Sequence, residues 1–473
     1  MSAFAKILVA NRGEIAIRVL RAANEMGKAT VAVFSDEDRL ALHRSKADES
    51  YRIGEGMGPV SAYLAVDEIM RVAADTGTDA IHPGYGFLSE SPEFADACEG
   101  HGIAFIGPRP ETLRRLGDKV SARAIAAASG VPTVPASGVL PEDPEAALTL
   151  AEEVGFPGIL KASWGGGGRG MRVVESAGEL EAALLAARRE ASAAFGKDEI
   201  YLERFIRRAR HLEVQVLADA DGRIVHLFER DCSVQRRNQK IVECAPAPGL
   251  SPARREELTG YALAIAREAD YLNAGTVEFL HDLDTDRFHF IEVNPRIQVE
   301  HTVTEQVTGV DLVRAQIRIA EGAPIGDGPD AACPPQSAIA LRGHAVQCRI
   351  TTEDPLDRFI PDYGRITAYR VATGFGIRLD GGTAYTGAVI TRHYDSLLEK
   401  VTAWAPSREG AIDRMRRALR EFRIRGVATN IAFLERLVGG EAFRRGQVTT
   451  RFIDDNPELL EFTRPRDRAS RLL

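Results

Sequence analysis

Apolar residues near the start of the chain alternate between short continuous runs and helical spacing. Residues 6–11 (KILVAN) and 30–35 (TVAVFS) are apolar and β-branched, which predicts two buried strands. Residues 13–26 between them repeat apolar positions at the period of a helix, and Gly27 is placed to end it. This strand–helix–strand pattern recurs over residues 79–108. We therefore expect an open parallel sheet through about residue 115.

The pattern changes to period two after about residue 206, following a smaller glycine-containing region at 130–205. Two pairs of alternating segments, 211–219 with 223–231 and 275–282 with 287–294, flank short turns and predict antiparallel hairpins. Beyond residue 340, short strand-like runs surround one helical stretch, REGAIDRMRRALREF. The fold class expected is α/β followed by α+β, with a mixed β/α C-terminal part.

The segment KASWGGGGRGMR, residues 161–172, holds four consecutive glycines. A bare glycine run is equally typical of a flexible linker. Here the run lies between two apolar strand-like segments, and Lys161 ends the first of them. A lysine beside exposed backbone N–H groups is suited to phosphate oxygens. These two features favour a hairpin whose tip covers phosphates.

Two glutamates occupy matching positions in the hairpin of residues 275–294. If its turn is centred on Thr285, Glu278 and Glu292 face each other with Cβ atoms about 4.5–5.5 Å apart. Alternation assigns one face to Thr276, Glu278, Glu292 and Asn294, and the core face to Val277, Phe279, Ile291 and Val293. Two carboxylates and an amide oxygen suit Mg²⁺, or Mn²⁺.

A solvated strand face would explain two glutamates as simply. The same alternation, however, continues through Arg296, Gln298 and Glu300, although Pro295 must interrupt the hydrogen-bond ladder. Polar groups spaced by two and ending in a cation and a carboxylate favour a reaction centre.

Composition excludes several classes of protein. The 473 residues are enough for two or three domains, and a net charge of −8 lacks the basic footprint of a general nucleic-acid binder. The five cysteines have no CxxC spacing, which argues against a disulfide framework or a zinc site. Neither a signal peptide nor an 18-residue uncharged apolar run is present, so we expect a cytoplasmic protein without a membrane span.

Several motifs resemble those of ATP-grasp enzymes, and among them the biotin carboxylase component of biotin-dependent carboxylases. They are spread over nearly the whole chain: ILVANRGEIAIRV, HPGYGFLSE, FIGP, LGDK, KASWGGGGRGMR, RHLEVQVLAD, ERDCSVQRRNQK, EVNPRIQVEHTVTE and RGHAVQCRI. Trp164, Asn238, Pro295 and Thr302 resemble the N-terminal part of pyruvate carboxylases more than acetyl-CoA carboxylase subunits.

The resemblance implies a division of the chain. An N-terminal Rossmann-like (pre-ATP-grasp) domain is expected at 1–115, and an ATP-grasp domain at 116–335 with a mobile lid at about 133–206. A C-terminal biotin carboxylase domain is expected at 336–455, and residues 456–473 are expected to be a linker toward an absent carboxyltransferase region.

The resemblance also implies a reaction in which ATP phosphorylates bicarbonate to carboxyphosphate, whose CO₂ is transferred to biotin. The residues expected to bind ATP are Lys119, Lys161, Gly166, Gly167, Gly168, Met171, Glu203, Arg204, Ile206, His211, Gln235, Asn238 and Glu278. Those expected to hold the metal are Glu278, Glu292 and Asn294. Those expected around bicarbonate and biotin are Tyr85, Lys240, Arg296, Gln298, Val299, Glu300 and Arg342.

Four of these residues are expected to act in catalysis. Lys240 and Arg296 bind the bicarbonate oxyanion, Glu300 is the general base that deprotonates it, and Arg342 stabilises the biotin enolate.

Three functions remain open at this stage. The first is the biotin carboxylase module of a pyruvate carboxylase, which makes carboxybiotin but not oxaloacetate by itself. The second is the same chemistry in an acyl-CoA carboxylase, and the third is an ATP-binding module without turnover. The joint presence of Glu278, Glu292, Arg296, Glu300 and Arg342 argues against the third. The expected partners are a biotin carboxyl carrier domain, a carboxyltransferase domain and further copies of the chain in a homo-oligomer.

Overall fold

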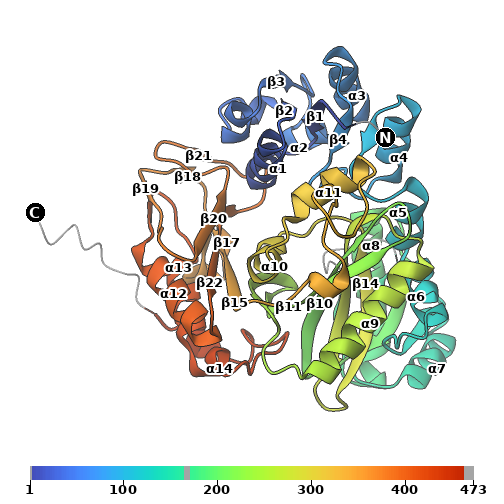
Figure 1. Cartoon of the computed structure of the whole chain (residues 1–473). Helices are drawn as coiled ribbons and strands as arrows, with labels where there is room; N and C mark the ends of the chain where they lie inside the picture. Colours follow the sequence, from blue (N-terminus) through green and yellow to red (C-terminus); the bar gives the residue numbers. More distant parts are fainter. Residues whose placement is uncertain (1–2, 164–170, 463–473) are drawn as a thin grey trace, which may run out of the picture.

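The structure is a computed structural model that describes residues 3–163 and 171–462 (Figure 1). Its N-terminal elements are β1 (Lys6–Val9), α1 (Gly13–Glu25), β2 (Ala29–Phe34), β3 (Glu49–Arg52), α2 (Pro59–Tyr63), α3 (Val66–Asp75), β4 (Ala80–His82), α4 (Pro92–Gly100), β5 (Ala104–Phe105) and α5 (Pro110–Gly117). The strands pair in parallel in the order β3-β2-β1-β4-β5. This confirms the predicted parallel sheet, and Gly27, with φ +72°, follows the end of α1 as expected.

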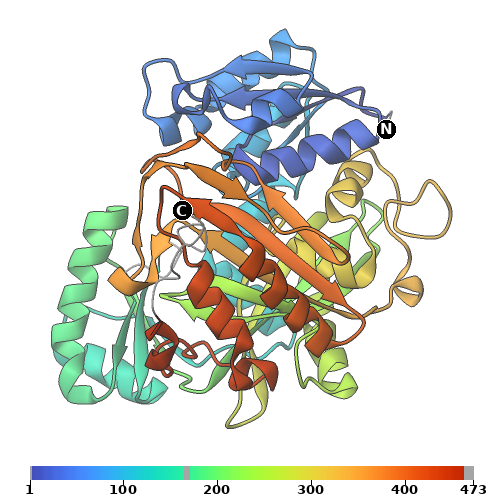
Figure 2. The ribbon, with the colours of Figure 1, turned by 90° about the vertical axis from the view of Figure 1, so that its left-hand side faces the viewer.

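The next elements form a small lobe with a core of its own. They are β6 (Ala136–Val139), α7 (Pro144–Val154), β7 (Gly158–Ala162), β8 (Arg172–Val174), α8 (Leu180–Phe195) and β9 (Ile200–Arg204). Four strands in the order β6-β9-β7-β8 pack against the two helices, and one hydrophobic cluster, all from residues 140–202, fills the space between. Figure 2 shows this lobe standing out from the rest of the molecule.

The arms of the predicted glycine hairpin are present in this lobe. Strands β7 and β8 pair antiparallel, with Gly158 opposite Val174 and Leu160 opposite Arg172. The glycines that connect them fall outside the described residues.

An antiparallel sheet of eight strands forms the body of the molecule. The central part of the chain supplies five strands of this sheet and four helices: α6 (Lys119–Ala128), β10 (Ala209–Ala218), β11 (Ile224–Arg236), β12 (Gln239–Ala245), α9 (Pro252–Glu268), β13 (Asn273–Asp282), β14 (Arg287–Asn294), α10 (His301–Thr308) and α11 (Leu312–Ala320). The C-terminal part supplies β15 (His344–Thr351), β20 (Ile377–Gly381), β22 (Leu397–Ala405), α12 (Arg408–Glu421), α13 (Ile431–Gly439) and α14 (Glu441–Arg444). Short strand pairs β16–β17, β18–β21 and β19–β23 lie at Glu353–Asp354 with Ile360–Pro361, Gly364–Arg365 with Val389–Ile390, and Ala368–Arg370 with Arg423–Arg425.

The sheet order, β14-β13-β10-β11-β12-β15-β22-β20, joins two parts of the chain that the sequence pattern treats separately. Strand β12 pairs with β15, for example Val242 with Cys348, so the C-terminal strands extend the same sheet. The predicted hairpins and the predicted helix at 408–422 are confirmed. No local sequence pattern, however, predicts the pairing of β12 with β15.

The sheet has one apolar and one polar face over β10, β13 and β14. Side chains such as Val214, Val277 and Phe279 pack with α6 and α9 in one buried cluster. The alternate positions, including Glu213 and Glu278, point to the opposite face. This alternation places a row of charged side chains inside the molecule. None of the helices within 3–163 and 171–462 has both the length and the apolar character needed to cross a membrane.

A β-bulge changes the predicted hairpin register near its turn. Glu278 pairs with Glu292 as expected, but Phe279 pairs with Phe290 because Ile291 is an extra residue in β14. Phe290 is therefore in the core at 0% exposure, whereas Ile291 is only half-buried. The predictions that Ile291 faces the core and that the turn is centred on Thr285 are wrong for this reason.

The bulge predicts unequal effects of truncating neighbouring side chains. Phe290→Ala should lower the free energy of unfolding by about 3–5 kcal/mol, since it empties a fully buried site. Ile291→Ala should cost clearly less. Urea unfolding of the two variants beside the parent protein measures both values, and an equal or larger loss for Ile291→Ala would contradict the bulged register.

Candidate active site

Three carboxylates lie in register across neighbouring strands on the polar face of the sheet. Glu278 of β13 faces Glu292 of β14 on one side and Glu213 of β10 on the other. Like charges at directly opposed positions repel, so such a row needs cations beside it. Arg230 of β11, at 0% exposure, supplies one through its ion pair with Glu213.

Lys240 is the cation at the centre of this cluster. Its ammonium lies 2.7 Å from Glu278 Oε1 and 2.8 Å from Glu300 Oε1, and it also contacts Glu213. Burial acts to lower the pKa of Lys240, but the three carboxylates outweigh it and raise that pKa well above its usual range. Lys240 therefore stays charged and is held in place by three anions.

Glu300 is fully buried and is held by cations from two strands. Arg349 of β15 places Nη2 3.0 Å from Glu300 Oε2 and donates through Nε to Glu243 at 2.6 Å. Burial favours the neutral acid, but Lys240, Arg349 and Arg230 together lower the pKa of Glu300 well below its usual range. The carboxylate is thus ionised at neutral pH.

The predicted metal ligands converge. Asn294 Nδ2 lies 2.9 Å from Glu278 Oε1 and 3.5 Å from Glu292 Oε1, so the amide stands between the two acids. The pKa of Glu292 is raised by its burial and by the neighbouring charge of Glu278, with Lys119 opposing the rise. The two carboxylates are oxygen ligands of the kind that suits a divalent cation, whereas Asn294 turns its nitrogen toward them and its oxygen toward Arg296.

His211 and Gln235 support the same carboxylate. His211 Nε2 lies 2.9 Å from Glu278 Oε2, and its Nδ1 accepts a hydrogen bond from Gln235 Nε2 at 3.0 Å. Burial acts to raise the pKa of Glu278, and Lys240 with His211 lowers it below the usual range. Both predicted residues therefore lie at the site and orient Glu278.

The segment after β14 leaves the sheet but keeps its side chains together. The predicted alternation ends at Asn294, because Pro295 has no N–H to continue the ladder. Arg296 nevertheless donates to Asn294 Oδ1 at 3.0 Å and to Gln298 Oε1 at 2.8 Å, and Gln298 Nε2 donates to Glu278 Oε1 at 3.1 Å. The bicarbonate residues predicted from resemblance thus adjoin the carboxylate row through a loop instead of a strand.

The lobe contributes a second group of predicted residues. Lys161 of β7 forms an ion pair with Glu203 of β9, which also accepts from Arg123 at 3.3 Å. Arg204 turns away and donates to the backbone carbonyl of Val154 at 3.0 Å. Two further predicted ATP residues, Ile206 and Met171, are half-buried next to the ends of β9 and β8.

Other predicted residues lie outside this cluster. Asn238 is exposed in the turn between β11 and β12, where it and Arg237 have φ of 63° and 47°. Arg342 is exposed, and its main chain bonds with Val307 and Trp404. Gly166, Gly167 and Gly168 lie outside the described residues.

Four charged residues of the cluster were missed from the sequence. Continuing the alternation into HLEVQV and its partner strand would have found Glu213 and Arg230. Glu243 and Arg349 depend on the pairing of β12 with β15, for which the sequence gives no local signal.

Three family models match consecutive parts of the chain. They are "Biotin carboxylase, N-terminal domain" at residues 3–113, "Carbamoyl-phosphate synthase L chain, ATP binding domain" at 118–327 and "Biotin carboxylase C-terminal domain" at 347–455. The biotin carboxylase domain of Hydrogenobacter thermophilus 2-oxoglutarate carboxylase, solved with MgADP, ADP and bicarbonate, is 45% identical with a TM-score of 0.93. The match covers 98% of this chain and 100% of that one. The chain belongs to the biotin carboxylase family.

These matches confirm the resemblance predicted from the motifs. Biotin carboxylases are ATP-dependent ligases. Pyruvate carboxylases are also similar. Mitochondrial pyruvate carboxylase of Homo sapiens is 53% identical over 99% of this chain and 39% of its own length. Pyruvate carboxylase of Rhizobium etli, solved with acetyl coenzyme A, is 62% identical with a TM-score of 0.93, over 100% of this chain and 42% of that one. The chain thus spans about two fifths of the length of these relatives.

Removing the shared cation should destabilise this biotin carboxylase in a pH-dependent way. Lys240→Met leaves three carboxylates without their common partner, at a cost of about 3–5 kcal/mol in unfolding free energy at pH 8. The depressed pKa values of Glu278 and Glu300 stabilise the parent protein above the unfolded-state pKa of about 4.3. Without Lys240 those pKa values rise, so the deficit should shrink between pH 8 and pH 5.

Denaturant unfolding at the two pH values measures this deficit. Lys46→Met, at an exposed position, is the control and should change stability by less than about 0.5 kcal/mol at either pH. A deficit for Lys240→Met that is equal at both pH values would contradict the coupling.

Proposed function

We propose that the chain carboxylates biotin with bicarbonate at the expense of ATP, through carboxyphosphate, as the first half-reaction of a pyruvate carboxylase. The observation that carries this proposal is the single ammonium of Lys240, which contacts both Glu278 and Glu300. Glu278 belongs to the predicted metal set and Glu300 to the predicted bicarbonate pocket. The Lys240 ammonium therefore contacts both the carboxylate proposed to hold the metal and the carboxylate proposed to deprotonate bicarbonate.

On the nucleotide side, Glu278, Glu292 and Asn294 would hold Mg²⁺ or Mn²⁺, which neutralises charge on a transferring phosphoryl group when bound. The burial of the two carboxylates and the effect of the Glu278 charge on Glu292 support this assignment. Lys119 and Lys161 would contact the phosphates, with Lys161 exchanging Glu203 for a phosphate oxygen. Glu203, Arg204 and Ile206 would border the adenine, as the resemblance implies.

On the acceptor side, Lys240, Arg296, Gln298 and the backbone of Val299 would bind bicarbonate. The ionised Glu300 would take the bicarbonate proton, and the freed oxygen would attack the γ-phosphorus as ADP leaves. A carboxylate with a depressed pKa is a weak base, but Lys240 and Arg296 also favour the carbonate dianion that forms when bicarbonate loses its proton, and so they lower the cost of the transfer. The base role thus depends on the cations that hold Glu300 in place.

Carboxyphosphate would then yield CO₂ and phosphate, the phosphate would take the proton of the biotin ureido N–H, and the deprotonated nitrogen would attack the CO₂. The exposed Arg342 would stabilise negative charge on the ureido oxygen, and Tyr85 would border the biotin. An exposed cation is suited to a substrate that arrives on a carrier.

The full activity and the partners are part of this proposal. Identities of 53% and 62% with pyruvate carboxylases support the pyruvate branch, a biotin carboxyl carrier domain and a carboxyltransferase domain as partners. An acyl-CoA carboxylase subunit is the alternative, because this half-reaction does not itself select the final acceptor. The predicted domain boundaries, the homo-oligomer and the cytoplasmic location remain predictions.

ATP hydrolysis by the purified chain should depend on bicarbonate and Mg²⁺ and should increase with free biotin. Glu300→Gln should lower the bicarbonate-dependent rate by about 10²–10⁴-fold while ATP still binds, because the proton acceptor is lost and the residues proposed to bind ATP are unchanged. Glu256→Gln, at an exposed position on α9, is the matched control and should keep the full rate. ATP hydrolysis that ignores bicarbonate would refute the proposed reaction, and an active Glu300→Gln would refute the base assignment.

The final acceptor is tested by adding separate carrier and carboxyltransferase proteins of the pyruvate and acyl-CoA classes. Oxaloacetate formed from pyruvate and labelled bicarbonate is the expected product. Label in an acyl-CoA instead would move the chain to the alternative branch.

A further inference from the structure

A fully buried lysine from the C-terminal part contacts the backbone of the proposed bicarbonate pocket. Lys400 of β22 is 0% exposed, and its ammonium donates to the backbone carbonyl of Val299 at 3.0 Å. The same ammonium lies 2.9 Å from Glu14 Oε2 at the start of α1. One side chain thus connects three segments that are far apart in the sequence.

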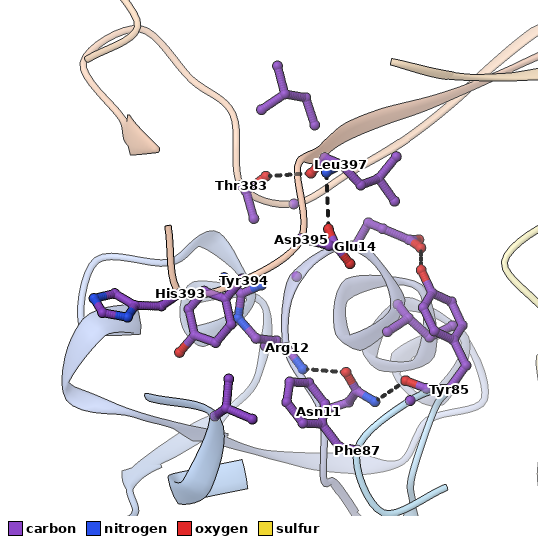
Figure 3. Close-up of a pocket in the computed structure, with 16 residues that line it drawn as sticks. Asn11, Arg12, Glu14, Tyr85, Phe87, Thr383, His393, Tyr394, Asp395 and Leu397 are labelled. Carbon is purple, nitrogen blue, oxygen red and sulfur yellow. Dashed lines mark hydrogen bonds between the residues drawn. The ribbon is translucent and has the colours of Figure 1, made fainter. Parts of the chain in front are cut away.

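Glu14 extends this connection to a second predicted site residue. Its other oxygen, Oε1, accepts a hydrogen bond from the hydroxyl of Tyr85 (Figure 3). The backbone of the loop at 83–85 is also held in place, because Asn11 Nδ2 donates to the carbonyls of Pro83 at 2.6 Å and Tyr85 at 2.9 Å. The Tyr85 phenol is therefore set by the same ion pair that holds the Val299 carbonyl.

The surrounding packing keeps Glu14 in place. A Cβ on Gly382 would lie 2.4 Å from the backbone of Gly13 and Glu14, so the C-terminal loop touches the first turn of α1. Glu14 and Tyr85 also border a cavity of about 300 Å³ between the N-terminal and C-terminal parts (Figure 3). The contacts of Glu14 with Lys400 and Tyr85 thus lie where these two parts meet.

Stability alone is a poor reason for a lysine at this position. Burying an ammonium and a carboxylate costs desolvation energy, and apolar residues of similar volume often stabilise a fold as well or better. The contacts of Lys400 suit a different purpose, since its ammonium donates to one backbone carbonyl and forms an ion pair with one carboxylate. Val299 itself lies between Gln298 and Glu300, both bound into the charged cluster.

We propose that Lys400 is a positioning residue, which holds the Val299 carbonyl directly and the Tyr85 phenol through Glu14. The bicarbonate pocket and the biotin-facing loop then keep one relative position. This inference rests on the proposed function, because bicarbonate and biotin define the two places being aligned. Lys400 touches neither substrate.

The test uses the double variant Glu14→Gln/Lys400→Met, which removes both charges together and leaves Gln an acceptor for Tyr85. The KM values for bicarbonate and for free biotin should each rise about tenfold, because misplacement weakens both, while the KM for ATP stays within about twofold. The matched control is Lys28→Met/Glu321→Gln, a half-buried lysine–glutamate pair that joins separate regions but contacts neither Val299 nor Tyr85. The control should change none of the three KM values.

Hydrogen exchange measured on the same proteins without substrates provides a readout independent of turnover. The double variant should lose amide protection in both 83–90 and 295–301, and the control in neither. Unchanged protection in these segments, or unchanged KM values with a rate that falls only with the folded fraction, would overturn the positioning role. An inactive parent protein would refute the proposed function, and the exchange result would still decide whether Lys400 holds the two segments together.

Discussion

The charged cluster around Lys240 is the constraint on which the rest of the site depends. Three glutamates from separate strands or loops contact one ammonium, and all of them are buried or nearly so. Such an arrangement is costly to desolvate and is stable only when each charge is matched. The matching requires β10, β12 and β13 in fixed register, which explains why the site lies on the eight-stranded sheet, the widest within the described residues.

Much of the fold follows from local pattern. The run KILVAN, the helix after it and Gly27 determine the first parallel unit, and the alternation in GTVEFLHD and RFHFIEVN determines the pairing of Glu278 with Glu292. The error at Ile291 arose because a bulge adds one residue without any compositional sign. Register was therefore predictable at the charged end of the hairpin and not at its turn.

The candidate site was predictable where its residues share a strand or a motif. Glu278, Glu292 and Asn294 share one face by alternation, while the motif resemblance indicated Lys240, Arg296 and Glu300. Arg349 and Glu243 meet only because β12 pairs with β15 across about a hundred residues. Lys400 presents the same difficulty, since its partners at positions 14 and 299 come together only in the folded chain. Interactions of this kind depend on tertiary contacts that no local window contains.

The pairing of β12 with β15 also bears on how the molecule can be divided. Backbone hydrogen bonds continue from β10, β11 and β12 into the C-terminal strands, so cutting the chain between them would leave an open edge. An unpaired edge strand readily recruits another chain, which makes aggregation the natural fate of such a fragment. The small lobe, whose apolar residues form their own cluster, lacks this dependence. Evolution or protein engineering could therefore exchange the lobe more easily than it could shorten the eight-stranded sheet.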